Sequence, residues 1–368
     1  MLKIILDKSS QYDTIMYMNE TILTARQKHI LNVINQSNGL LREEIQGKIS
    51  RLFPVSKPTI IRDINILLKK KLIIMEGKAR ATRYKSKVQN PLLRKFDLEV
   101  YFANDPDNRI GARKFFDFDI FMNLHDLFLP VEIEILEKVT LSFREKTNKL
   151  SPDLLKRELE RFVIELSWKS SKIEGNTYTL LETESLIKEQ KEAIGKSKNE
   201  AIMILNHKTA FEEILKAKKD FKTISVSGIN QLHYILIKNL GITFGIRKQA
   251  VGITGTTYHP LDNEHQIKEA FEKMVDIVNR TKNPYEKALI THFVIPYIQP
   301  YADGNKRTAR MLTNAILLAY DLYPLSYRSV NEEEFKKALI LFYEQESICD
   351  IKRLFIEQVK FANGTYFR

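Results

Sequence analysis

The chain has 368 residues, of which 43% are hydrophobic and 28% charged, with 13 glycines and 11 prolines. This composition excludes disordered and fibrous proteins and predicts two or three ordered domains of roughly 100 to 200 residues each. The single cysteine, Cys349, excludes an intramolecular disulfide. The sequence has no apolar run near the roughly 20 residues of a spanning helix, and its start lacks a secretory apolar region. We therefore expect a cytoplasmic protein without a membrane partner.

The net charge of +12 is concentrated near one end of the chain. Residues 21–90 carry 15 Lys and Arg against 4 Asp and Glu, whereas all other residues carry 43 against 42. A positive field confined to one module is typical of nucleic-acid binding, with a merely solvated basic surface as the alternative.

The same basic segment has the pattern of a small helical domain that ends in a hairpin. Thr24 caps a first predicted helix, LREEIQGKIS forms a second, and Ser56 with Pro58 starts a third. The following stretch, LIIMEGKARATRYKSK, alternates and turns at Gly77, which predicts a two-stranded β-hairpin.

This arrangement resembles a winged helix-turn-helix domain, which we place at residues 1–90. The resemblance implies that the third helix enters the major groove of DNA and that the hairpin touches phosphate. A protein-interaction role for the same fold is the alternative. The candidate DNA-binding residues lie on that helix and hairpin: Lys57, Thr59, Arg62, Lys78, Arg80 and Arg83.

Helical patterns dominate the rest of the chain, so we expect a mainly α fold. Residues 91–150 are rich in aromatics, show few clear periodicities and are interpreted as a connecting segment. Residues 245–260 alternate Gly and Thr, which predicts a short β-hairpin on the helical body. The predicted helices cover residues 153–170, 180–193, 197–217, 226–239, 264–279, 284–298, 306–320 and, with breaks, 332–360.

One short loop carries the densest chemistry of the chain. A predicted helix ends at Gln299-Pro300, and the next begins near Lys306, so Tyr301 to Asn305 form a loop that feeds a helix N-terminus. Such a terminus presents unpaired N–H groups and the positive end of a dipole, which favours anions. Gly304 allows a positive φ, Arg307 and Arg310 share one helix face, and Asp303 offers oxygen to Mg²⁺. These features predict a nucleotide-phosphate site, and an ordinary turn with a solvated arginine face is the alternative.

The stretch from Gln299 to Arg310 resembles the signature of the Fic (Fido) family, which reads His, Pro, aromatic, any, Asp or Glu, Gly, Asn, Gly or Lys, Arg, two residues, Arg. Every defining position matches except the first, where Gln299 replaces His. Most Fic proteins transfer AMP from ATP to a hydroxyl of a target protein. The resemblance implies an all-helical Fic domain at residues 151–368 with ATP and Mg²⁺ as ligands. It assigns the metal to Asp303, the phosphate cradle to Gly304, Asn305 and Lys306, and the β and γ phosphates to Arg307 and Arg310.

A second motif of the same family lies upstream in SSKIEGN. Ser170, Glu174 and Gly175 match its inhibitory pattern, in which the glutamate pairs with the second motif arginine and fills the space of the γ-phosphate. The resemblance therefore implies autoinhibition by an N-terminal helix, through an ion pair between Glu174 and Arg310.

The hairpin predicted at residues 245–260 resembles the flap with which Fic proteins align a target segment by main-chain pairing. The flap candidates are Thr254, Gly255, Thr256 and Tyr258, and a plain surface hairpin is the alternative.

The residue at the first motif position leaves the activity open. In the family a His there accepts the proton of the attacking hydroxyl, whereas the amide of Gln299 does not titrate. Two histidines are weak substitutes: His292 on the same helix, which we expect to be buried, and His259 near the flap. The first hypothesis is a slow AMP transferase, and the second is a nucleotide-binding regulator that acts through the winged helix. The resemblance also allows a homodimer.

Overall fold

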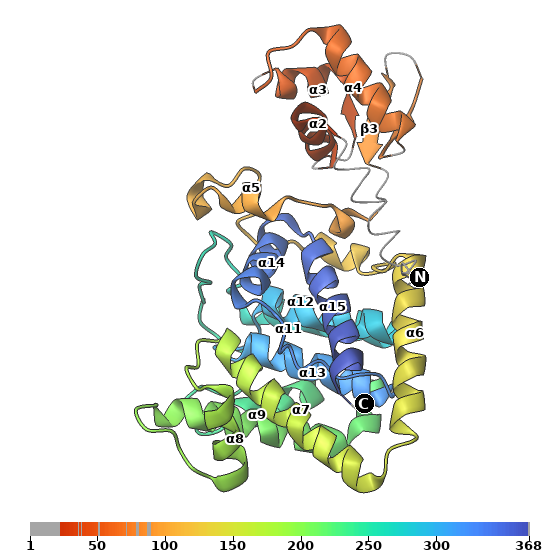
Figure 1. Cartoon of the computed structure of the whole chain (residues 1–368). Helices are drawn as coiled ribbons and strands as arrows, with labels where there is room; N and C mark the ends of the chain where they lie inside the picture. The colour runs from red at the N-terminus through yellow and green to blue at the C-terminus, as the bar shows by residue number, and fades with distance from the viewer. Residues whose placement is uncertain are drawn as a thin grey trace. The chain divides into compact units, whose positions relative to one another are not determined.

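The computed structural model describes residues 23–366 except positions 36, 38, 51, 71, 79–80 and 87–89. The chain divides into two compact units, Met1–Asp97 and Leu98–Arg368. Both are drawn in Figure 1, and each has its own buried apolar core. In the described part of the chain, every helix is too short or too polar to cross a membrane.

The first unit contains three helices and a three-stranded antiparallel sheet in the order β1-β3-β2. The three predicted helices and both predicted strands are present, and isoleucines and leucines of all three helices form the core. Ser56 has extended backbone angles as N-cap of the third helix, and Pro58 lies in its first turn. The elements are α2 (Ala25–Asn35), β1 (Leu40–Leu41), α3 (Arg42–Ile49), α4 (Lys57–Lys69), β2 (Ile73–Glu76), β3 (Arg83–Ser86) and the 3₁₀ turn η2 (Pro91–Leu93).

The turn after β2 requires the glycine that the sequence has there. Gly77 has φ +88°, and a Cβ at this position would lie 2.7 Å from the carbonyl oxygen of Ala81. Any side chain here would therefore clash with the Ala81 carbonyl, and its own backbone would be strained at this positive φ.

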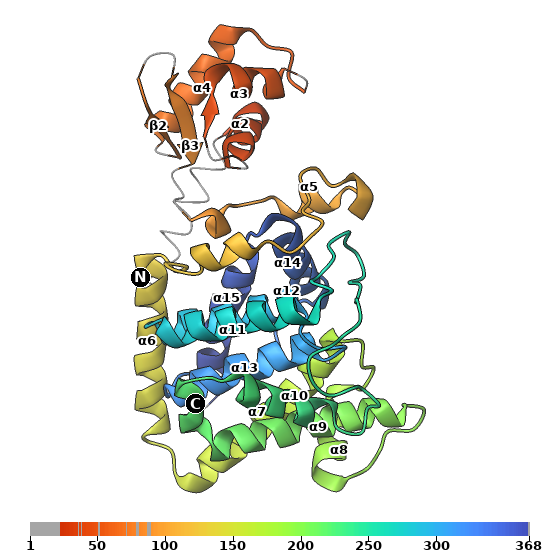
Figure 2. The same cartoon turned by 180° about the vertical axis from the view of Figure 1, so that it is seen from behind.

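The second unit is almost entirely helical (Figures 1 and 2). Helices α12 and α13 lie at its centre and pack against each other, while α11 covers α12 and both α9 and α10 cover α13. Two further pairs, α6 with α15 and α7 with α9, complete the body. The elements are α5 (Leu98–Phe102), η3 (Pro106–Asn108), η4 (Phe118–Asn123), α6 (Pro130–Thr147), α7 (Pro152–Ile173), α8 (Leu180–Glu189), α9 (Lys198–Lys216), η5 (Lys218–Lys222), α10 (Val226–Ile237), α11 (Glu264–Arg280), α12 (Pro284–Ile298), α13 (Asn305–Ala319), α14 (Glu332–Gln345) and α15 (Cys349–Thr365).

Caps explain why the helices after residue 150 agree with the predictions. Ser151 accepts a hydrogen bond from the Leu154 amide at the start of α7, and Asn283 accepts from two amides at the start of α12. Such caps satisfy amides that the helix itself leaves unpaired. Helix α12 is buried on nearly all sides, so the loop that follows it is held by a rigid element.

Helix α6 is not predicted by the sequence. Only Leu136 and Thr140 among its 18 residues are buried, so its apolar pattern is weak. Residues 98–150, interpreted from the sequence as a connecting segment, belong to the second unit, where α6 packs on α15.

Residues 245–260 differ from the expected β-hairpin. They contain a turn at Gly255 but no paired strands, and their one bridge joins His259 to Phe115. The reason is that other partners take up this backbone. The buried Arg247 donates to the carbonyls of Gln249 and Leu261 and to the motif loop, so the two halves do not pair with each other.

Candidate functional site

The loop between α12 and α13 has the backbone that an anion site requires. Gln299 ends α12 in the left-handed region at φ 52°, and Gly304 precedes α13 at φ 84°. A Cβ on Gly304 would lie 3.1 Å from Ile237 Cγ2 and 3.3 Å from His233 Nε2, so the loop lies tightly against α10. No side chain of the described chain caps α13. The first amides of α13 are therefore left for a ligand.

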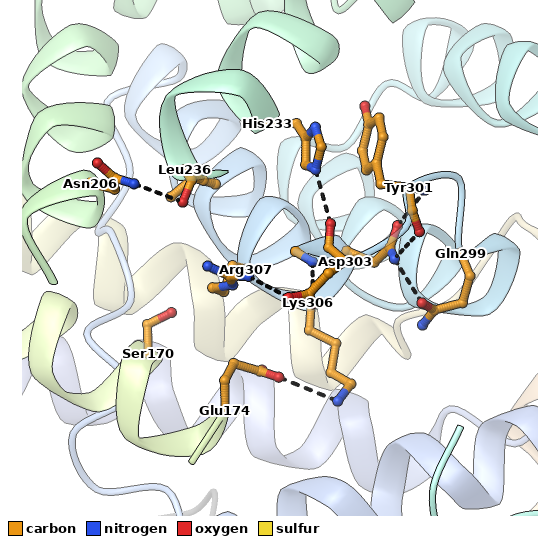
Figure 3. Close-up of polar contacts among 12 residues, drawn as sticks. Ser170, Glu174, Asn206, His233, Leu236, Gln299, Tyr301, Asp303, Lys306 and Arg307 are labelled. Carbon is orange, nitrogen blue, oxygen red and sulfur yellow. Dashed lines mark hydrogen bonds and ion pairs between the residues drawn. The ribbon is translucent and has the colours of Figure 1, made fainter. Parts of the chain in front are cut away.

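Hydrogen bonds and ring stacking hold the loop in this shape (Figure 3). Asn305 accepts from the Tyr301 amide through Oδ1 (2.9 Å) and donates to the Tyr301 carbonyl through Nδ2 (2.8 Å). The His233 ring stacks on Tyr301 at 3.6 Å and donates from Nε2 to the Asp303 carbonyl at 2.9 Å. Burial lowers the pKa of His233 to about 4, so the ring is neutral at pH 7. The sequence gives no signal for His233, which lies on an apolar helix.

The side chain of Gln299 is fixed at both ends. Its Nε2 donates to the Pro296 carbonyl at 2.9 Å, and its Oε1 accepts from Asn305 Nδ2 at 2.7 Å. The side chain is buried, and Arg247 donates to the Gln299 carbonyl at 2.6 Å. An amide held in this way keeps the loop in place but accepts no proton.

The two motif arginines are both buried and lie one turn apart on α13. Arg307 donates from Nη2 to Asp303 Oδ2 at 3.0 Å, while its Nη1 is buried without a hydrogen-bond partner. Burial lowers the pKa of Arg307, and the nearby carboxylates of Asp303 and Glu174 act against that shift. A buried N–H without a partner is costly, so this atom is a natural donor to an incoming anion.

Glu174, the C-cap residue of α7, lies against Arg310 and Lys306. Its Oε1 is 2.8 Å from Arg310 Nη1. Its Oε2 is 3.4 Å from Lys306 Nζ, as Figure 3 shows. Burial alone raises the pKa of Glu174, but the charges of Arg310 and Lys306 outweigh it and hold the value at about 2. Gly175 follows at φ 98° and lets the chain turn away. The structure therefore brings together the inhibitory and phosphate-binding candidates.

The candidate metal ligand Asp303 belongs to no cluster of metal-binding side chains among the described residues. Its side chain is 66% exposed and already pairs with Arg307. Among the described residues, no group of three or more His, Cys, Asp or Glu side chains could hold a metal. This donor set fits Mg²⁺ that arrives with a nucleotide, because such an ion uses one or two carboxylates and the phosphates.

The flap candidates are held by contacts with the helical body. Gly255 accepts from Arg109 through its carbonyl at 2.9 Å, and Thr256 donates to Glu344 at 2.6 Å. Tyr258 is buried and donates to the Tyr297 carbonyl at 2.9 Å, whereas Thr254 is exposed.

Of the two histidines considered as substitute bases, His292 is buried as expected. Its ring faces Thr313 and Tyr327, and burial with the nearby charge of Arg310 lowers its pKa to about 3. His259 is exposed beside the ring of Phe115.

The basic candidates of the first unit lie mostly on its surface. Lys57 and Arg62 on α4 and Lys78 after β2 are exposed, and Thr59 bonds to Ser56. Arg83 donates to the Gly39 carbonyl at 3.0 Å and keeps half of its side chain exposed. Arg80 lies outside the described residues.

Comparisons with known proteins identify the helical domain. Residues 223–317 match the model of the Fic/DOC family. The chain is 27% identical over 206 residues to a protein from Nematostella vectensis named protein adenylyltransferase Fic, which covers 50% of this chain and 44% of the relative. It is also 27% identical over 158 residues to protein adenylyltransferase fic-1 of Caenorhabditis elegans, covering 42% of this chain and 31% of the relative. The chain thus spans less than half of the length of these curated relatives.

Solved structures show the same fold. A fragment of Fic-1 from C. elegans superposes with a TM-score of 0.56 at 22% identity, over 64% of this chain and 71% of the other. A Fic-domain signalling protein from Bacteroides thetaiotaomicron superposes with a TM-score of 0.52 at 20% identity, over 62% of this chain and 95% of the other. The family match includes the signature at residues 299–310, and the solved structures share the fold: residues 223–317 form a domain similar to that of the Fic/DOC family.

Proposed function

We propose that this chain binds ATP with Mg²⁺ at the N-terminus of α13 and slowly transfers AMP to a hydroxyl of a target protein. The observation that carries the proposal is the pair of buried arginines, Arg307 and Arg310, behind a glycine turn at an uncapped helix end. Buried cations need an anion, and Glu174 supplies one to Arg310. A triphosphate that displaces this carboxylate takes over its charge, so Glu174 opposes nucleotide binding.

The chain's own residues have separate roles in this proposal. Gly304, Asn305 and Lys306 line the phosphate cradle, Arg307 and Arg310 neutralise the phosphates, and Asp303 holds the Mg²⁺ that the nucleotide brings. The metal supplies positive charge next to the phosphate oxygens. Asp303 must exchange its bond to Arg307 for this role, and that exchange frees a second Arg307 nitrogen for phosphate.

The transfer step is slow because the proton of the attacking hydroxyl has no basic acceptor at position 299. The hydroxyl oxygen forms a bond to the α-phosphorus, the bond to the β-phosphate oxygen breaks, and pyrophosphate leaves. The proton passes to solvent, since Gln299 is held by Pro296 and Asn305. A positioned general base typically contributes about 10² to 10⁴ in rate. Orientation and charge stabilisation remain.

Nucleotide binding is tested by titrating ATP and Mg²⁺ into the wild-type chain and a Glu174→Ala variant in a calorimeter. The variant should bind about tenfold more tightly or better, because the competing charge-assisted contact is gone. Glu160→Ala, on the exposed face of the same helix, is the matched control and should bind like the wild type. Failure of Glu174→Ala to bind ATP would overturn the proposal.

Transfer is tested with α-labelled ATP, Mg²⁺ and a cell lysate. Labelled protein should accumulate slowly with Glu174→Ala and more slowly with the wild type. If Glu174→Ala binds ATP yet labels nothing, the chain is instead a nucleotide-binding regulator, the second hypothesis from the sequence.

The first unit supports a second proposed function, the binding of duplex DNA by a winged helix-turn-helix. The observation in its favour is the exposure of Lys57 and Arg62 on α4 and of Lys78 at the hairpin turn, in the most basic part of the chain. If Arg62 and Lys78 contact phosphates, replacing both by alanine should lower the slope of log K against log salt by about 2.

The matched control for that test removes the same charge elsewhere. Lys149 and Lys156 are exposed in the second unit, and replacing both by alanine should leave the slope unchanged. DNA affinity that is equal in the two double variants would count against this surface.

A further inference from the structure

Arg310 is held by Ser170 more extensively than by the carboxylate it neutralises. Its Nε donates to Ser170 Oγ and its Nη2 to the Ser170 carbonyl, both at 2.9 Å. The remaining nitrogen, Nη1, faces Glu174 Oε1 at 2.8 Å and has no other partner in the described chain. Two of the three guanidinium nitrogens are therefore fixed by one residue of α7, and the third is occupied by another.

The hydroxyl of Ser170 is in turn oriented by His207 on α9. His207 Nδ1 lies 2.8 Å from the Met203 carbonyl, which can only accept, so Nδ1 carries the proton. The ring is fully buried, and burial lowers its pKa to about 3, so Nε2 is a bare acceptor at pH 7. Nε2 lies 2.9 Å from Ser170 Oγ. The hydroxyl must donate to His207, and its lone pair is left facing Arg310 Nε.

Arg310 can exchange one anion for another and keep its bonds to Ser170. Displacing Glu174 by a phosphate changes the partner of Nη1 alone, and the bonds from Nε and Nη2 to Ser170 can stay. Without Ser170 Oγ, Nε would be a buried donor without a partner, and of the two bonds to Ser170 only the one from Nη2 to the carbonyl would remain to hold the guanidinium. Rigid support of a binding group is what fixes its geometry toward a ligand.

We propose that Ser170 and His207 position Arg310 for a nucleotide phosphate, so that they assist the binding which Glu174 opposes. The sequence motif groups Ser170 with Glu174 as inhibitory, and the contacts separate their roles. His207 is a positioning residue that acts through Ser170. This inference rests on the proposed function, because it assumes that Arg310 binds phosphate.

The first test measures ATP affinity in the Glu174→Ala background, where the competing carboxylate is absent. Adding Ser170→Ala should weaken binding about tenfold, since one charge-assisted bond that orients Arg310 is lost. Ser167→Ala is the matched control, because Ser167 is equally buried three positions earlier on α7 and its hydroxyl has no hydrogen-bond partner among the described residues. Affinity that is equal or tighter with Ser170→Ala would overturn the proposal and assign Ser170 to the inhibitory contact.

The second test separates the role of His207 from a general structural one. His207→Phe keeps a ring but loses the acceptor, so it should weaken ATP binding like Ser170→Ala. His207→Gln can still accept from Ser170 and should restore most of the affinity. The double variant of Ser170→Ala and His207→Phe should bind ATP no more weakly than either single variant. Both substitutions break the same series of hydrogen bonds, from His207 through Ser170 to Arg310. Additive losses would overturn the coupling.

A third measurement needs no nucleotide. The Nε–H of Arg310, identified by its loss in Arg310→Lys, should give a slowly exchanging side-chain NMR signal in the wild type. That signal should disappear with Ser170→Ala or His207→Phe and persist with Ser167→Ala. If no variant binds ATP, the proposed function fails, while this signal still decides the positioning role: an unchanged signal in Ser170→Ala overturns it.

Discussion

The two ends of the loop and helix at residues 299–310 are built differently. At the Arg310 end, Glu174 occupies a cation through a contact that another anion can replace. At the Gln299 end, both polar atoms of the side chain are taken up within the loop, by Pro296 and Asn305. The proposed binding end is thus complete but occupied by Glu174, whereas the proposed reacting end is held in place and lacks a base.

This difference indicates that the proposed ATP binding and the proposed AMP transfer depend on separate residues. The residues that would hold phosphates keep their geometry whether or not position 299 can titrate, because Asn305 and His233 fix the loop. The substitution at Gln299 should therefore change the rate of transfer and leave affinity almost unchanged. Removal of Glu174 should raise the affinity for ATP, and it should speed transfer only by increasing the fraction of the protein that holds ATP.

The largest expected effect comes from restoring a base. In a Glu174→Ala background, Gln299→His should raise the rate of AMP transfer by about 10² to 10⁴, the usual contribution of a positioned general base. The rate is measured as labelled protein formed per unit time with α-labelled ATP. ATP affinity should change little, because no phosphate-contacting residue is altered.

The control for this change is Gln299→Ala in the same background. It also removes the bond to Asn305 but supplies no base, so its rate should stay at or below that of the glutamine form. A Gln299→His variant that binds ATP yet gains no rate would show that position 299 is not the proton acceptor.

Most of the second unit could be predicted from local signals. Caps such as Ser151 and Asn283 and the apolar spacing of each helix place the elements, and the motif itself locates the loop. The contacts that define the site join residues distant in sequence, for example His233 with Asp303 and His207 with Ser170. A buried histidine on an apolar helix gives no local sign of its partner, so these contacts required the structure.

At residues 245–260 a local sequence signal was present, but it predicted the wrong structure. Its Gly and Thr pattern favours a hairpin locally, but Arg109 and Glu344 from elsewhere bind Gly255 and Thr256, and the segment's own Arg247 bonds to the Gln299 carbonyl. Tertiary partners outweighed the local preference, which is weak for short strands.

A smaller effect should appear in the pH dependence of stability. The pKa of Glu174 is lowered to about 2 because Arg310 and Lys306 outweigh the effect of burial. A carboxyl whose pKa is lowered by folding stabilises the fold at pH values above its pKa in the unfolded chain, which is near 4.5. This contribution is lost as the pH falls toward the pKa of the folded state, about 2. The free energy of unfolding of wild type minus Glu174→Gln should therefore shrink by roughly 2 to 4 kcal/mol between pH 5 and pH 2.

Urea unfolding at a series of pH values measures this difference. Glu160→Gln on the exposed face of α7 provides the baseline for general acid effects. A difference between wild type and Glu174→Gln that stays constant down to pH 2 would contradict the ion pair as the cause.

The smallest effect tests the backbone that both ends of the site share. Gly304→Ala must place a Cβ at φ 84°, within 3.1 Å of Ile237 and 3.3 Å of His233. The left-handed backbone costs an alanine roughly 1 to 2 kcal/mol, and displacing His233 disturbs its bond to Asp303.

Gly364→Ala in α15 has open space around the new Cβ and should be neutral or slightly stabilising. Because the loop supports both ends, Gly304→Ala should weaken ATP binding and, in the Gln299→His background, transfer as well. If transfer falls while affinity is unchanged, the two ends do not share this support.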